Sequence, residues 1–185
     1  MTIDDPAQRP PTMDDVTGLP QARAAAGGKG FEGPVEFAQV LRSAMALACD
    51  GQTRRICWCD EDFAAWPIGE VEWIDQLTRW ARLGGRELVM IARDYAVIER
   101  RHPRFVVWRR AWSHVIQCLV PEETRVEALP ALWIDSGDQA LRVFDREHLR
   151  GRIGFGRVDR QRAREDFDAI SQRANPGFSA ATLGV

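Results

Sequence analysis

The sequence is short of several residue types that often carry chemistry. Among its 185 residues there are three histidines, four cysteines and a single lysine. The cysteines contain no CxxC pair, and no histidine stands at zinc-finger spacing from them. We therefore expect no metal and no cofactor, and we interpret the thiols as buried packing groups. They are Cys49, Cys57, Cys59 and Cys118.

Long apolar runs are also missing. No stretch approaches the ~18 consecutive apolar residues of a membrane-spanning helix. The N-terminus lacks the basic start and the apolar run of a signal peptide. We expect a cytoplasmic protein with no membrane contact.

The charges nearly balance. Lys and Arg number 25 and Asp and Glu 27, for a net charge of −2, and this difference falls within residues 1–33. A neutral domain does not indicate nucleic-acid binding. Arginine outnumbers lysine 24 to 1, which suits bidentate contacts to anions, although codon bias in a GC-rich genome explains it more simply.

The first 33 residues differ in composition from the rest. They hold four prolines and five glycines but few large aliphatic side chains, so burial would not offset the entropy of ordering them. We predict a flexible tail over 1–33, of which about the first 30 residues are removable without unfolding. Residues 34–185 are long enough for one domain with a sizeable core.

Hydrophobic periodicity places the elements of this domain. Helical spacing predicts helices over about 34–50, 70–83, 94–112 with a break at His102-Pro103, and 158–173. Apolar runs predict strands over about 54–59, 88–92, 115–120, 132–135 and 140–144. The order predicts an α/β domain with a mixed sheet and helices on both faces.

One segment resembles a known catalytic strand without its catalytic groups. Residues 128–135 read Ala-Leu-Pro-Ala-Leu-Trp-Ile-Asp, followed by a hairpin-like turn. In the phospholipase D superfamily the corresponding strand reads HxKxxxxD. Ala128 stands at the histidine register, Pro130 at the lysine register and Asp135 at the aspartate register.

Residues 35–178, approximately, resemble one half of a phospholipase D-like fold. The chain is most similar to uncharacterised proteobacterial domains on that fold that lack HxKxxxxD. The residues that suggest this group are Asp94, His102-Pro103, Arg110 and Ser113, which have the spacing of its fingerprint.

Active members of the superfamily need the histidine as a nucleophile and the lysine to hold phosphate charge. Ala128 and Pro130 supply neither, so the resemblance implies a non-catalytic module that binds a partner or a small anionic ligand. Asp135 is then better interpreted as a hairpin-turn residue.

A second hypothesis retains catalysis. A hydrolase or transferase would use a rebuilt site around Asp94, His102, Arg110 and Asp135, with Ser113 as a further ligand-binding candidate. The simpler alternative is that Asp94 and His102 cap helix segments.

Arginines gather in residues 142–164, where eight arginines and three acids give a local net charge of +5 with His148 neutral. Arg146, Arg150 and Arg157 are the anion-binding candidates, because paired guanidinium groups suit phosphate. A solvated helix surface is the alternative interpretation. Nucleic-acid binding is a weaker hypothesis, since the domain as a whole is neutral.

The resemblance also bears on assembly. Phospholipase D-like active sites lie between two halves, and this chain has the length of one, so the resemblance implies a homodimer. Trp66-Pro67, and Trp73 with Trp80, are candidates for a partner surface.

Overall fold

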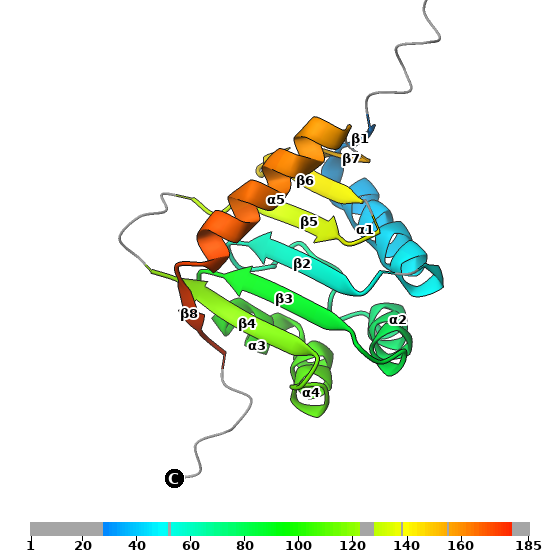
Figure 1. Cartoon of the computed structure of the whole chain (residues 1–185), viewed down its shortest axis with the longest axis vertical. Helices are drawn as coiled ribbons and strands as arrows, with labels where there is room; N and C mark the ends of the chain where they lie inside the picture. Colours follow the sequence, from blue (N-terminus) through cyan, green and yellow to red (C-terminus); the bar gives the residue numbers. More distant parts are fainter. Residues whose placement is uncertain (1–27, 52, 123–127, 138, 155, 179–185) are drawn as a thin grey trace, which may run out of the picture.

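Eight strands form one mixed sheet in the computed structural model, with helices against both faces (Figure 1). The structure describes residues 28–51, 53–122, 128–137, 139–154 and 156–178. The strands are β1 (Lys29–Phe31), β2 (Arg55–Asp60), β3 (Glu87–Ala92), β4 (Ile116–Pro121), β5 (Ala131–Asp135), β6 (Ala140–Asp145), β7 (Arg150–Ile153) and β8 (Ala174–Pro176). The helices are α1 (Gly33–Asp50), α2 (Val71–Arg82), α3 (Ala96–Arg101), α4 (Pro103–Ala111) and α5 (Arg157–Ser171).

The strand order is β1-β7-β6-β5-β2-β3-β4-β8. The central strands β2, β3 and β4 are parallel, and β5 runs antiparallel beside β2. The carboxyl ends of β2 to β4 therefore meet the start of β5 at one end of the sheet, called here the carboxyl end. The β5–β6 turn lies at the opposite end, called the amino end.

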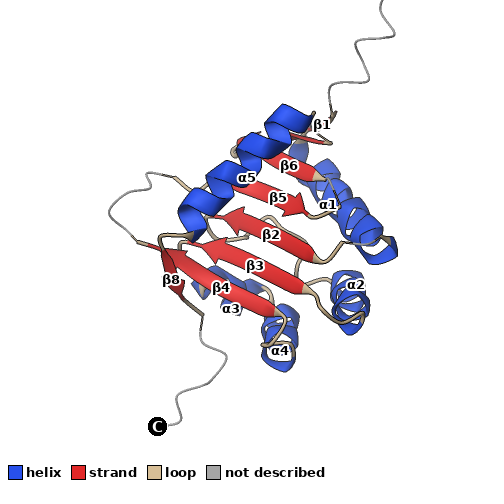
Figure 2. Cartoon of the chain, in the orientation of Figure 1, coloured by secondary structure: helices blue, strands red, loops and turns tan. Residues whose placement is uncertain are grey.

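The helices divide unequally between the two faces. α1 to α4 lie on one face, and α5 alone crosses the other (Figure 2). This arrangement confirms the prediction of an α/β domain with a mixed sheet covered on both sides.

Aromatic side chains fill the layer between the sheet and α1 to α4. The rings of Trp58 and Trp133 lie 5.5 Å apart between centroids, and Trp73 lies 5.7 Å from Trp58. Trp66, Trp73 and Trp80 are all buried. The suggestion that these three form a partner surface is therefore wrong, because they pack into the core.

The layer under α5 is smaller and contains two of the thiols. Cys57 and Cys59 alternate with Trp58 along β2, so both face α5, where Phe167 and Ala163 cover them. Burial raises the pKa of Cys57 to about 11 and that of Cys59 further. These thiols are protonated packing groups at neutral pH, as the sequence indicates.

Three strands, β1, β7 and β8, lie where the sequence predicts none. β1 falls inside the predicted tail, and it pairs with β7 through Lys29–Ile153, Gly30–Arg152 and Phe31–Gly151. The domain thus begins before residue 33, whereas residues 1–27 lie outside the described part. β8, which follows α5 directly, pairs with the end of β4.

Glycine and short length explain why the sequence pattern does not predict β1 and β7. A Cβ atom on Gly151 would lie 2.3 Å from the ring of Phe31, so the close crossing of the two strands requires glycine there. Strands of three or four residues that include a glycine are too short to show the alternating pattern by which strands are recognised.

Within the described ranges, none of the helices has both the length and the apolar composition needed to cross a bilayer.

Replacing Phe31 tests whether β1 is an integral part of the domain. Phe31 is only 5% exposed, so Phe31→Ala leaves a cavity and should lower the free energy of unfolding by about 3 kcal/mol. Urea unfolding measures this. The matched control is Val35→Ala, because Val35 is 77% exposed. Equal stability of the two variants would mean that β1 does not contribute to the core.

Candidate functional site

Two groups of charged side chains lie at opposite ends of the sheet. The first, at the carboxyl end, begins with Asp60, the last residue of β2 and only 6% exposed. Its carboxylate accepts hydrogen bonds from Trp66 Nε1 at 3.1 Å, from the backbone N of Phe63 at 3.3 Å and from Arg146 Nη1 at 3.3 Å.

Glu61 continues this group through Arg93. Arg93 Nε lies 2.7 Å from one carboxylate oxygen of Glu61, and the backbone N–H of Leu129 donates to the other. Burial raises the pKa of the Glu61 carboxyl, but the hydrogen bonds from Arg93 and Leu129 and the attraction of Arg93 and Arg146 outweigh it, so the pKa lies below its ordinary value.

Leu129 connects the two ion pairs. Its N–H donates to Glu61, and its carbonyl accepts from Arg146. Leu129 stands between Ala128 and Pro130, the registers where the resemblance requires histidine and lysine. The main chain of Leu129 is thus bound by Glu61 and by Arg146. Because Asp60 and Glu61 already accept hydrogen bonds from arginines and backbone groups, they are not arranged to transfer a proton to a substrate.

Asp94 and His102 also lie toward the carboxyl end, in separate environments. The carboxylate of Asp94 accepts from the backbone N of Ala96 at 2.6 Å, at the start of α3. The His102 ring is buried between the α3–α4 junction and the β2–α2 loop, with Nε2 3.3 Å from the carbonyl of Phe63. Burial lowers the pKa of His102, which keeps the ring neutral.

Arg110 and Ser113 lie at the other end of α4 and are exposed. The buried arginine is its neighbour, Arg109, whose Nε lies 3.2 Å from Cys118 Sγ and whose guanidinium stacks 4.2 Å from the ring centre of Phe178. The sequence does not distinguish the two arginines, because only the contacts of α4 with Cys118 of β4 and with Phe178 decide which one faces inward.

Asp135 occupies the amino end and is 2% exposed. Its carboxylate accepts from the backbone N–H groups of Gly137 at 2.7 Å and Gln139 at 3.1 Å, and from Trp133 Nε1 at 3.3 Å. These bonds hold the β5–β6 turn, as expected for an Asx-type turn residue.

The rebuilt catalytic site is therefore not assembled as the sequence suggested. Asp94 and His102 lie at one end of the sheet, whereas Asp135 pairs with Ile56 at the other. A six-residue strand separates the ends by roughly 20 Å.

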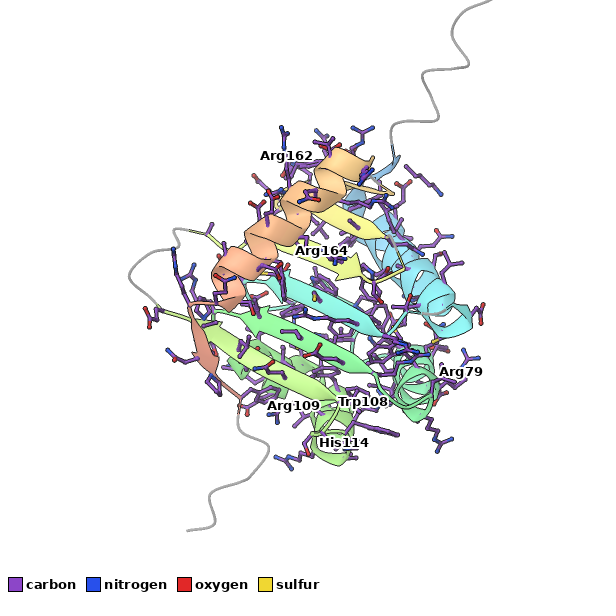
Figure 3. The ribbon with its side chains drawn as sticks, in the orientation of Figure 1. Arg79, Trp108, Arg109, His114, Arg162 and Arg164 are labelled. Carbon is purple, nitrogen blue, oxygen red and sulfur yellow. The ribbon has the colours of Figure 1, made fainter. Side chains whose placement is uncertain are left out.

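The second charged group is a groove at the amino end. Three arginines of α5, Arg157, Arg160 and Arg164, follow each other at spacings of three and four residues and so share one side of the helix. Together with Ser136 and Gln139 of the β5–β6 turn they line a cavity of about 490 Å³, called here the arginine groove. In Figure 3, Arg164 lies over β5, whereas Arg162 lies on the other side of α5.

The Ser136 hydroxyl is oriented by the main chain. Its oxygen accepts hydrogen bonds from the backbone N–H groups of Arg54 at 2.8 Å and Arg55 at 3.1 Å. Because the oxygen accepts both of these bonds, the hydroxyl proton is left to act as a donor.

The charge order along α5 runs against the helix dipole. Residues 157–164 contain four arginines and one acid, whereas 165–171 contain three acids and no base. Positive side chains near a helix N-terminus and negative ones near its C-terminus are each unfavourable by roughly 0.3–1 kcal/mol. Arg157 and Arg160 lie in the first turn of α5, so the helix dipole does not account for them.

The three anion-binding candidates from the sequence have different environments. Arg146 is engaged by Asp60 and Leu129, and Arg150 pairs with Glu32 at 2.7 Å. Arg157 lines the groove. Sequence reasoning missed the roles of Arg160 and Arg164, although the regular spacing of Arg157, Arg160 and Arg164 was a detectable signal.

Across the described residues, His, Cys, Asp and Glu side chains form no group of three or more that could hold a metal ion.

Comparison with protein-family models and with curated proteins gives no match. Among solved structures, the chain is similar to TrmBL2, an archaeal chromatin protein whose structure shows a novel mode of DNA binding. The TM-score is 0.57 and the sequence identity 9%, over 88% of this chain and 57% of that one. This chain therefore spans little more than half of that protein's length, and the likeness supports the fold alone.

The paired charges at the carboxyl end predict a pH-dependent stability. Because the folded pKa of Glu61 lies below its ordinary value of 4.5, its contribution is present above that pH and is lost as the pH falls through the folded pKa. Glu61→Gln should cost about 2 kcal/mol at pH 7. The difference from wild type should shrink below pH 4.5.

Urea unfolding at several pH values measures this difference. The matched control is Glu99→Gln on the exposed side of α3. A Glu61→Gln effect that stayed constant from pH 7 to pH 3 would contradict an ionic origin.

Proposed function

We propose that this protein is a non-catalytic binding module whose ligand carries a phosphate or a similar anionic group in the arginine groove. The observation that carries the proposal is the stripe of Arg157, Arg160 and Arg164, which lines a polar cavity and whose first two members oppose the helix dipole. A feature that costs helix stability requires another reason, and anion binding supplies one.

The groove offers suitable chemistry for such a ligand. Guanidinium groups donate pairs of parallel hydrogen bonds that match phosphate oxygens. Ser136, Gln139 and Gln161 add neutral polar side chains to the lining around them. A volume of about 490 Å³ lies within the range of small-molecule sites.

The same proposal describes the module as phospholipase D-like. The support is the resemblance of 128–135 and the order of strands, hairpin and closing helix. A phosphodiesterase of that kind would need a nucleophile at Ala128 and a cation at Pro130, and the neighbouring Leu129 is bound by Glu61 and Arg146 instead. A cytoplasmic location agrees with four cysteines that form no disulfide.

Nucleic acid is the competing ligand for a basic groove. The structurally similar TrmBL2 is a chromatin protein whose structure shows a mode of DNA binding. The second half of α5, however, is acidic and would repel an extended phosphate backbone. We therefore favour a small ligand, and a DNA duplex becomes one arm of the test.

Pyrophosphate binding tests the arginine groove. We expect pyrophosphate to raise the melting temperature of the wild-type protein, because a ligand that binds only the folded state stabilises it. Arg157→Ala and Arg164→Ala should each weaken binding about tenfold, the effect of losing one charge-assisted hydrogen bond. Isothermal titration calorimetry at low salt measures the affinities.

Arg162→Ala is the matched control, because it removes the same charge from the side of α5 away from the groove. An equal loss of pyrophosphate affinity in all three variants would mean that binding depends on the overall charge of the protein and not on the arginine groove. Tighter binding of a short DNA duplex than of pyrophosphate, lost in the groove variants, would replace the small-ligand proposal by nucleic-acid binding.

Phosphodiesterase activity should be absent. We expect no turnover of an aryl phosphodiester above the buffer rate, because Ala128 and Pro130 provide neither nucleophile nor cation. Turnover that survived repurification and was lost in His102→Gln or Asp135→Asn would contradict this expectation and reinstate an enzyme.

A further inference from the structure

An apolar groove opens between α2 and α4, on the face of the sheet opposite the arginine groove. Its volume is about 630 Å³. The apolar side chains that line it are Ile74, Pro103, Val107, Trp108, Ala111 and Trp112. Val107 is 67% exposed, and an exposed apolar surface of this kind is typical of an interaction site.

The base of this groove is fixed in place. Trp108 Nε1 donates to Thr78 Oγ1 of α2 at 3.1 Å, and the Trp108 ring stacks on Trp112 with centroids 6.3 Å apart. Figure 3 shows Trp108 between the two helices. Rigid aromatic side chains of this kind are favoured as interface anchors, because they lose little entropy on binding.

A stripe of charge runs along α2 beside the groove. Glu72, Asp75, Arg79 and Arg82 are exposed and follow each other at spacings of three, four and three residues, so they share the outer side of the helix. Arg79 projects from this side in Figure 3. Within the described residues, none of the four forms a side-chain hydrogen bond or salt bridge.

The order of these charges is self-complementary. Two α2 helices that pack antiparallel across a twofold axis at position 77 bring Glu72 opposite Arg82, and Asp75 opposite Arg79, of the second copy. One axis satisfies both pairs, and each pair occurs twice in a symmetric dimer. Since α4 lies beside α2, the same axis brings the two apolar grooves together.

We propose that a second copy of this chain docks on the outer side of α2 and the adjoining α2–α4 groove, forming a twofold dimer. The charged stripe sets the register of the pair, and the groove side chains supply the apolar burial. The interface lies across the sheet from the arginine groove, so it does not depend on ligand binding there.

Light scattering and analytical ultracentrifugation over micromolar concentrations test the dimer. The wild-type protein should show twice the 20.9 kDa of one chain. Asp75→Arg places like charges opposite each other at two points and should weaken dimerisation about tenfold or more. The double variant Asp75→Arg with Arg79→Asp recreates the pairs with reversed sign and should restore the dimer.

Val107→Lys should also dissociate the dimer, whereas Val35→Lys, at a similarly exposed site on α1, should not. Melting temperatures of the variants verify that each one folds. A wild-type mass that stayed at 20.9 kDa, or a double variant as dissociated as Asp75→Arg, would overturn the proposal. Neither result would affect pyrophosphate binding, so failures of the two proposals are distinguishable.

Discussion

The pairing of β2 with β5 is the constraint on which the rest of the structure depends. Trp58 and Trp133 stand opposite each other on these antiparallel strands and pack at the centre of the aromatic layer. A slip of one residue would turn Trp133 away from the core, so its burial fixes the register. That register places Asp135 opposite Ile56 at one end of the sheet and Leu129 beside the β2 loop at the other.

The two ends of the sheet consequently differ in their electrostatics. At the carboxyl end, where open α/β sheets commonly bind ligands, Asp60 and Glu61 are compensated by Arg146 and Arg93. At the amino end, the arginines of α5 face the β5–β6 turn, where the carboxylate of Asp135 accepts hydrogen bonds from backbone N–H groups. Arginine side chains therefore gather at the end where the fold does not ordinarily place a site.

The sheet also separates two kinds of surface. The side covered by α5 is polar and rich in guanidinium groups, whereas the side covered by α2 and α4 exposes an apolar groove beside a balanced row of charges. Each surface is built on helices held by a buried layer, so substitutions of exposed residues such as Arg164 or Val107 change the surface without disturbing the core.

Local pattern determined much of this protein from its sequence. The 3.6-residue period located α1, α2 and α5, the continuous run of β3 identified a covered strand, and Asp135 was recognisable as a turn residue from its place between two strands. The sequence predicted helices at 103–111 and 157–171, but it did not determine the direction in which each arginine points. Only the tertiary structure selected Arg109 for burial, added the short strands β1 and β7, and separated Asp94 from Asp135. The physical reason is that strand pairing and helix docking join residues distant in sequence, whereas periodicity reports only on neighbours within a few turns.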